Sequence, residues 1–278
     1  MEAEEIKKAV RERYGEIAKT NNSCSPSAPS CCGPAKEENV LRKIGKKIGY
    51  SEDELTSVPD GANMGLGCGN PVALASMKEG QTVVDLGSGG GFDCFLAAQK
   101  VGDSGSVIGV DMTTAMIEKA RANAQKAGFK NVEFRLGEID NLPVADNTAD
   151  VIISNCVINL APDKPKVFRD AFRALKPGGS LMVSDIVLLK ELPPQIKESV
   201  GALTGCIAGA LLKDDYLQVI RGAGFSDVEV IDETVFPIGE DDAIVKEIGR
   251  EFEMSPEMIK EATDSFVSSV KVKAVKPS

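Results

Sequence analysis

Histidine is absent from this chain of 278 residues, which removes the commonest general base and the usual nitrogen ligand of zinc. The chain has no lysine- and arginine-rich run with interleaved aromatic residues, and its net charge of −10 argues against a surface that binds nucleic acid. The longest apolar stretches, such as 200–212, are too short and too rich in glycine to span a bilayer. The charged N-terminus lacks the features of a secretory signal. We therefore expect a cytoplasmic protein without nucleic-acid or membrane partners.

Cysteine, in contrast, is abundant and occurs an odd number of times. Because we expect no export, the thiols should be reduced rather than joined in a disulfide framework. Three of them fall in a stretch rich in serine and proline, 21–34, and the others are spread over the rest of the chain. The seven are Cys24, Cys31, Cys32, Cys68, Cys94, Cys156 and Cys206.

Apolar segments with strand and helix spacing alternate through the middle of the chain, which predicts a parallel sheet with helices on both faces. Strands are expected at 82–87, 106–111, 132–137, 149–155 and 179–187, and helices at 92–101, 114–128 and 164–176. Before this region the spacing predicts helices over 2–19 and 37–48. After it come helical segments, then an apolar run at 228–238. The final run, 269–276, alternates as an edge strand would.

The first expected strand leads into a glycine-rich loop, VVDLGSGGGFD (83–93). Gly87, Gly89 and Gly91 would let the backbone pass close to a ligand at the carboxyl edge of the sheet. Asp111 ends the next strand, where a carboxylate can accept both hydroxyls of a ribose. The alternative is that the glycines only form a tight turn and that Asp111 caps a helix.

This loop resembles motif I of the class I S-adenosylmethionine methyltransferases, and 136–154 and 175–185 resemble two further motifs of that family. The resemblance implies a Rossmann-like fold with a mostly parallel, seven-stranded sheet, and S-adenosylmethionine as cofactor. It implies that Asp111 holds the ribose, that Glu138 and Ile139 flank the adenine, and that Asn155 lies near the methionine part. The remaining donor-binding residues that it implies are Asp85, Gly87, Gly89 and Met112.

Three of the cysteines lie in segments that should meet at the carboxyl edge of this sheet. Cys156 follows the fourth strand in SNCVINL (154–160), Cys68 lies on the approach to the core, and Cys206 lies beyond the fifth strand. A single buried cysteine is usually a small apolar side chain. Three thiolates beside a methyl donor suit a soft, thiophilic atom, whereas structural zinc prefers four ligands.

The segments GLGCGNP, DLGSGGGFDC, GVDMT, SNCVINLAPDK and GCIAGA together resemble the arsenite methyltransferases, from about Tyr14 to Ala210. The resemblance implies detoxification by methyl transfer to arsenite and methylated trivalent arsenicals. It implies trivalent arsenic bound by Cys68, Cys156 and Cys206, with a further N-terminal cysteine that helps to load or cycle the arsenic. Cys24, Cys31 and Cys32 are candidates, and we favour Cys32. Turnover would then need a thiol reductant, either thioredoxin or a small thiol, while Cys94 is expected to be a packing residue.

Two other interpretations stay open. The chain could methylate a small organic acceptor, such as a quinone precursor, or it could be a non-catalytic thiol protein that binds metalloids. For the arsenite methyltransferase we expect three parts. Residues 1–70 bring Cys68 and the resolving cysteine, 71–190 form the donor-binding core, and 191–278 supply Cys206 and complete the acceptor site and the sheet.

Overall fold

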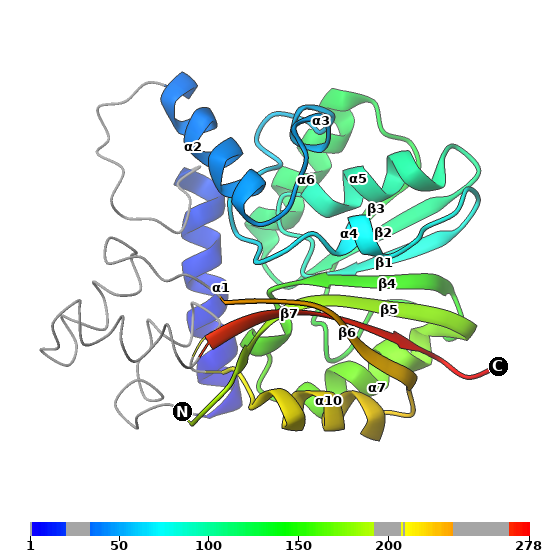
Figure 1. The fold of residues 1–278 in the computed structure, drawn as a ribbon. Helices are drawn as coiled ribbons and strands as arrows, with labels where there is room; N and C mark the ends of the chain where they lie inside the picture. The colour runs from blue at the N-terminus through cyan, green and yellow to red at the C-terminus, as the bar shows by residue number, and fades with distance from the viewer. Residues whose placement is uncertain (1, 21–33, 192–206, 208, 236–266) are drawn as a thin grey trace, which may run out of the picture.

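The computed structural model describes residues 2–20, 34–191, 207, 209–235 and 267–278. Its core is a seven-stranded sheet in the order β3-β2-β1-β4-β5-β7-β6 (Figure 1). The first five strands are parallel, and β7 pairs antiparallel with both β5 and β6. The expected mostly parallel, seven-stranded sheet is therefore confirmed. The strands are β1 (Thr82–Leu86), β2 (Ser106–Asp111), β3 (Val132–Leu136), β4 (Ala149–Asn155), β5 (Leu175–Leu188), β6 (Ser226–Val235) and β7 (Val267–Val275).

Helices cover both faces of the sheet, which explains why the central strands are apolar along almost their whole length. Helices α5 (Phe92–Val101) and α6 (Thr114–Ala127) lie on one face, and α7 (Lys164–Ala174) and α10 (Lys213–Gly222) lie on the other (Figure 1). Each face has its own buried apolar cluster. On the face that α7 and α10 cover, Phe168 of α7 meets Tyr216 of α10 edge to face, with ring centroids 5.6 Å apart.

The N-terminal helix lies at the carboxyl ends of the parallel strands (Figure 1). Helix α1 (Ala3–Thr20) runs across this edge of the sheet (Figure 1) and packs beside α6. The other elements are α2 (Pro34–Lys47), α3 (Glu52–Thr56), α4 (Pro71–Leu74) and the short 3₁₀ helix η1 (Ile158–Leu160). The helices expected at 2–19 and 37–48 are thus present. Within the described residues, none of the helices combines the length and the apolar character that crossing a bilayer requires.

The prediction that 269–276 is an edge strand is wrong. Strand β7 lies between β5 and β6 and is paired on both sides, while β6 occupies the edge. The alternating polar residues that suggested exposure have a partner on the neighbouring strand, because Lys271 forms a 2.7 Å ion pair with Asp232 of β6. The alternation of polar and apolar residues therefore did not distinguish an edge strand from a strand with antiparallel partners on both sides.

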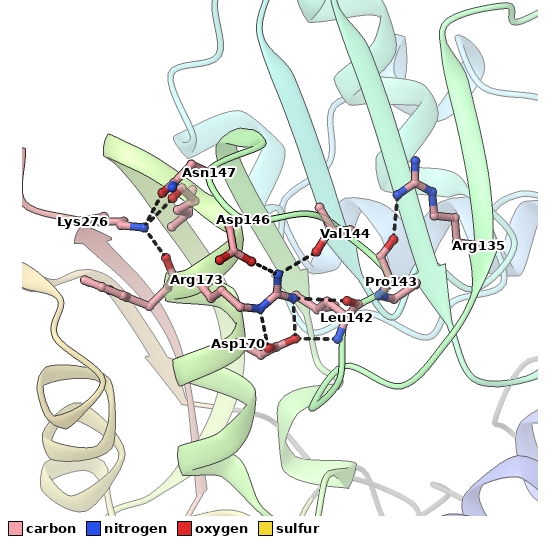
Figure 2. A network of polar contacts seen from close by, with 11 residues as sticks. Arg135, Leu142, Pro143, Val144, Asp146, Asn147, Asp170, Arg173 and Lys276 are labelled. Carbon is pink, nitrogen blue, oxygen red and sulfur yellow. Dashed lines mark hydrogen bonds and ion pairs between the residues drawn. The ribbon is translucent and has the colours of Figure 1, made fainter.

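Arg173 of α7 holds the loop between β3 and β4 in place. Its guanidinium donates hydrogen bonds to the carbonyls of Leu142 and Val144 and pairs with Asp146 and Asp170, as Figure 2 shows. These carboxylates hold the pKa of Arg173 above its usual range. The loop that begins directly after β3 is thereby fixed to the core, and its first residues line a cavity at the carboxyl edge of the sheet.

Candidate active site

A cavity lies at the carboxyl ends of β1, β2 and β4, and it encloses about 1140 Å³ of empty space, part of it open to solvent. The glycine loop forms its floor, and Lys7, Val10 and Tyr14 of α1 line it from the other side. All the residues expected to bind a methyl donor line this one cavity, although the expectation drew on four separate segments. They are Asp85, Gly87, Gly89, Asp111, Met112, Glu138, Ile139 and Asn155.

The glycine loop has a left-handed backbone. Gly87 and Gly89 have φ of +73° and +50°. A side chain at Gly87 would overlap Val157, whereas a Cβ at Gly89 would meet nothing within 4 Å. The loop thus passes beside open space at Gly89, as close approach of a ligand would require.

Asp111 ends β2 beside this loop and is oriented by two backbone amides. Its Oδ2 accepts a 3.0 Å hydrogen bond from the Gly89 N–H, and its Oδ1 accepts one of 2.8 Å from the Thr113 N–H. Burial raises the pKa of Asp111 above its ordinary value, although these amide hydrogen bonds act in the opposite direction. The carboxylate retains acceptor capacity for a polar group in the cavity.

Asn155, at the end of β4, links the cavity to the segment that carries Cys68. Its side-chain oxygen accepts the Cys68 N–H at 3.0 Å, and its Nδ2 donates to the Gly69 carbonyl at 2.8 Å and to Asp93 Oδ2 at 3.0 Å. Tyr50 donates to the other oxygen of Asp93 at 2.6 Å. Sequence reasoning missed Asp93 and Tyr50, although Asp93 lies in the first turn after the glycine loop.

Two carboxylates are buried at this end of the cavity. Burial raises the pKa of Asp93 to about 6, although the hydrogen bonds from Tyr50 and Asn155 lower it. Burial and the nearby Asp93 also raise the pKa of Asp85 well above its usual range. Asp85 accepts a hydrogen bond from the thiol of Cys94, which is fully buried in α5. Cys94 is therefore packed under the cavity, away from Cys68 and Cys156.

The opposite wall joins the loop after β3 to helix α1. Glu138, expected beside an adenine, forms 2.6 Å ion pairs with both Lys7 and Arg11 of α1, and Lys7 also pairs with Asp140 at 3.2 Å. The hydrogen bond from Lys7 is the main cause that lowers the pKa of Glu138. Sequence analysis did not anticipate these pairs, because about 130 residues separate the partners and no local pattern connects them.

The thiols of Cys68 and Cys156 meet at the end of β4, and both residues are buried. Cys156 has a φ of +58°, a strained value for a residue with a side chain, and its N–H donates to the Ser184 carbonyl at 2.8 Å. The Cys68 thiol donates to the same carbonyl at 3.5 Å. The strands thus place together two of the three predicted arsenic ligands. Cys206 lies outside the described residues, as do Cys24, Cys31 and Cys32.

A carboxylate completes this cluster. One oxygen of Asp185 in β5 and the sulfurs of Cys68 and Cys156 all lie within 4.8 Å of one another, and Asp185 has no exposed surface. Burial raises its pKa to about 7. Sequence reasoning missed Asp185, although the pairing of β4 with β5 places the VSD stretch (183–185) beside SNC (154–156).

Comparison with known proteins agrees with this geometry. A family profile described as a methyltransferase domain matches residues 77–224. The chain is 50% identical over 234 residues to an arsenite methyltransferase of Halobacterium salinarum, covering 82% of this chain and 59% of the relative. It is 36% identical over 248 residues to an arsenite methyltransferase of Aquipseudomonas alcaligenes, covering 87% of this chain and 68% of the relative.

A solved structure gives the same result. The crystal structure of an arsenic(III) S-adenosylmethionine methyltransferase from Chlamydomonas reinhardtii superposes with a TM-score of 0.62 at 32% identity, and the match covers 85% of this chain and 73% of that one. The chain thus spans about three fifths of the length of the Halobacterium relative and about two thirds of the Aquipseudomonas relative.

Proposed function

Because this chain belongs to the arsenite methyltransferase family, we propose that it transfers a methyl group from S-adenosylmethionine to trivalent arsenic held by cysteine thiolates. The observation that carries the proposal is the position of two buried thiols at the end of β4. Cys156 lines the same cavity as the glycine loop, and the Cys68 sulfur lies within 4.8 Å of the Cys156 sulfur. A soft acceptor bound there would lie beside a donor bound in the cavity.

The residues around the cavity fit the donor. S-adenosylmethionine supplies an electrophilic methyl group on a sulfonium, attached to a nucleoside and an amino acid. Asp111 offers carboxylate oxygens for ribose hydroxyls, and the open space at Gly89 allows the nucleoside to approach the backbone. The buried hydroxyl of Ser88 has no partner within the described protein, as expected for a group that a ligand completes. Asp85 and Asn155 would face the methionine part.

The acceptor chemistry agrees with a chain that contains no histidine. Trivalent arsenic keeps a lone pair that can attack the sulfonium methyl directly, so no side chain has to remove a proton from it. The protein mainly has to position the two reactants, and placement alone is worth effective molarities of roughly 10⁵–10⁸ M. Thiols with an ordinary pKa of about 8.5 must lose their protons as they bind arsenic.

Turnover needs further cysteines and a reductant. Cys206 would supply the third thiolate, and the transfer leaves arsenic formally pentavalent. Two electrons from neighbouring cysteines, with Cys32 the favoured member of the N-terminal group, would return it to the trivalent state and leave a disulfide. Thioredoxin or a small thiol would then reduce that disulfide, a requirement that suits a reducing cytoplasm. The products would be methylated trivalent arsenicals, so that the reaction serves arsenic detoxification.

The test compares acceptors with the wild-type protein, S-adenosylmethionine carrying a labelled methyl group, and a thiol reductant. We expect the label to appear in arsenic species when arsenite is supplied and not in a quinol supplied in its place. Label in the quinol alone would move the assignment to an organic acceptor. Donor binding without transfer to either would favour a different acceptor class, and the absence of donor binding would favour a metalloid-binding protein without catalysis.

A further inference from the structure

The side chains of Cys68, Cys156 and Asp185 form a cluster with an unusual combination of donors. Two are sulfur and one is oxygen, all three residues are buried, and the three donor atoms lie within 4.8 Å of one another. Trivalent arsenic in the proposed function uses thiolates, so arsenic binding alone gives no role to the carboxylate. A buried carboxylate beside two thiols therefore requires its own explanation.

Asp185 is held in the manner of a metal-ligating carboxylate. Its Oδ1 accepts hydrogen bonds from Asn159 Nδ2 at 3.0 Å and from the Ile186 N–H at 2.9 Å, and its Oδ2 accepts one from the Tyr216 hydroxyl at 3.2 Å. Partners of this kind fix the orientation of a ligand and are typical of the groups that surround metal ligands. They leave one acceptor position of the carboxylate, on Oδ2, available for a further bond.

The spacing of the three donor atoms fits one tetrahedral ion. Two sulfurs bound to zinc at about 2.3 Å lie roughly 3.8 Å apart, and a sulfur and a carboxylate oxygen lie roughly 3.6 Å apart. Since the donor atoms lie within 4.8 Å of one another, they need to approach by about 1.2 Å at most, which side-chain rotation can supply. Three ligands from the described residues leave the fourth position of a tetrahedral ion open.

Charge also favours a divalent cation. Two thiolates and one carboxylate carry three negative charges, and a divalent ion neutralises two of them. The third is balanced by the buried Lys164, which bonds to the carbonyls of Asn159 and Ala161 and lowers the pKa of Asp185 by its charge. A site of this kind can be buried without a large net charge, which would otherwise be costly.

We propose that Cys68, Cys156 and Asp185 form a binding site for a divalent cation of the Zn²⁺ class, and that the ion occupies the acceptor position and competes with arsenite. Its inhibitory effect rests on the proposed function, whereas the metal site itself does not. Zn²⁺ prefers mixed sulfur and oxygen ligands more than trivalent arsenic does, so Asp185 sets the balance between the two.

The test measures Zn²⁺ affinity by competition with a chromophoric chelator, under anaerobic conditions and with a phosphine as reductant. The protein used in this test carries the substitutions Cys24→Ser, Cys31→Ser and Cys32→Ser, so that the N-terminal thiols do not bind the metal. We expect one Zn²⁺ per chain, and we expect Asp185→Asn to lower the ratio of Zn²⁺ affinity to arsenite affinity by at least about tenfold. An unchanged ratio would overturn the proposal.

A spectroscopic arm separates ligation from a purely electrostatic effect. With Co²⁺ in place of Zn²⁺, Asp185→Cys should increase the thiolate-to-cobalt absorption by the contribution of one thiolate, because sulfur replaces the oxygen ligand. Absorption equal to that of the parent protein would show that position 185 does not touch the metal. This arm remains informative if Asp185→Asn fails to fold.

An activity arm tests the inhibition. In wild type, Zn²⁺ should inhibit methylation competitively with arsenite and not with the donor, and Asp185→Asn should need at least about tenfold more Zn²⁺ for half-inhibition of its own rate. Zn²⁺ binding in a protein that does not methylate arsenite under metal-free conditions would refute the proposed function and leave the metal site standing. Methylation of arsenite by a protein that does not bind Zn²⁺ would refute the metal site and leave the proposed function standing.

Discussion

Gly89 and Gly128 form a matched pair that tests whether the cavity holds the methyl donor. Both have positive φ, +50° and +75°, and an added Cβ at either would meet nothing within 4 Å. Gly89 lines the cavity, whereas Gly128 ends helix α6 and is not among the lining residues. Alanine at either position should lower the free energy of unfolding by about 1–2 kcal/mol, because an L-residue in the left-handed region is strained. Only at Gly89 does the new methyl group enter the cavity.

The effect on donor affinity follows from the space that this methyl group takes. Placing an extra methyl group in a well-packed region costs about 1–3 kcal/mol. Since each 1.4 kcal/mol corresponds to a factor of ten, the donor dissociation constant of Gly89→Ala should rise about 5- to 150-fold. The Gly128→Ala protein should bind the donor as the wild type does.

Isothermal titration calorimetry with S-adenosylhomocysteine measures donor-site affinity without turnover, and urea unfolding measures stability in the same preparations. Similar losses of stability with a loss of affinity only in Gly89→Ala would support the assignment of the cavity. Equal affinities in the two variants would refute it, because a ligand that tolerates the methyl group cannot lie against the glycine loop.

Three further results are expected. Asn155→Ala should lower the free energy of unfolding, measured in urea, by at least about 3 kcal/mol. Three polar groups in partly buried hydrogen bonds lose a partner, at about 1–3 kcal/mol each, and a change below about 0.5 kcal/mol would contradict the hydrogen-bond network. Lys7→Gln should raise the donor dissociation constant about two- to fivefold at low salt, because its partly exposed ion pair with Glu138 contributes little more than about 1 kcal/mol. In about 1 M salt, which screens the pair, the dissociation constant should hardly change. Equal effects at both salt concentrations would exclude the ion pair as the cause. Burial raises the pKa of Asp185 to about 7 in the folded protein, so the stability that Asp185 contributes is present below about pH 4 and is lost as the pH rises to about 7. Denaturation titrations should therefore show that wild type loses a few kcal/mol of unfolding free energy over this range relative to Asp185→Asn. Parallel pH profiles of the two proteins would contradict a buried, protonated Asp185.

Much of the fold could be predicted because its determinants are local. The period of the apolar residues identified β1 to β4 and helices α5 to α7, and the glycine loop was recognisable from VVDLGSGGGFD (83–93). The alternation in β7 was recognisable too, but its place in the sheet was not. Strand order depends on which strands pair with each other. Asp232 of β6, the partner of Lys271 in β7, lies about 40 residues away in the sequence, so no local pattern reveals the pairing.

The parts of the site that sequence reasoning missed are contacts between distant segments. Lys7 and Arg11 on α1 meet Glu138, and Tyr216 on α10 meets Asp185, without any local pattern that links the partners. The two thiols, in contrast, could be predicted, because the resemblance to the arsenite methyltransferases and the expected sheet edge both indicated Cys68 and Cys156. Their proximity in the structure supports the acceptor role.

The most direct test of that role is methyl transfer from labelled S-adenosylmethionine to arsenite by Cys156→Ser, with Cys94→Ser as the matched thiol-to-hydroxyl control. Both residues are buried cysteines, but Cys94 lies under the cavity beside Asp85, where a serine hydroxyl can also donate the hydrogen bond. We predict that Cys156→Ser forms no methylated arsenic although it binds the donor normally, and that Cys94→Ser retains most of the activity. Normal arsenic methylation by Cys156→Ser would contradict the thiolate acceptor site.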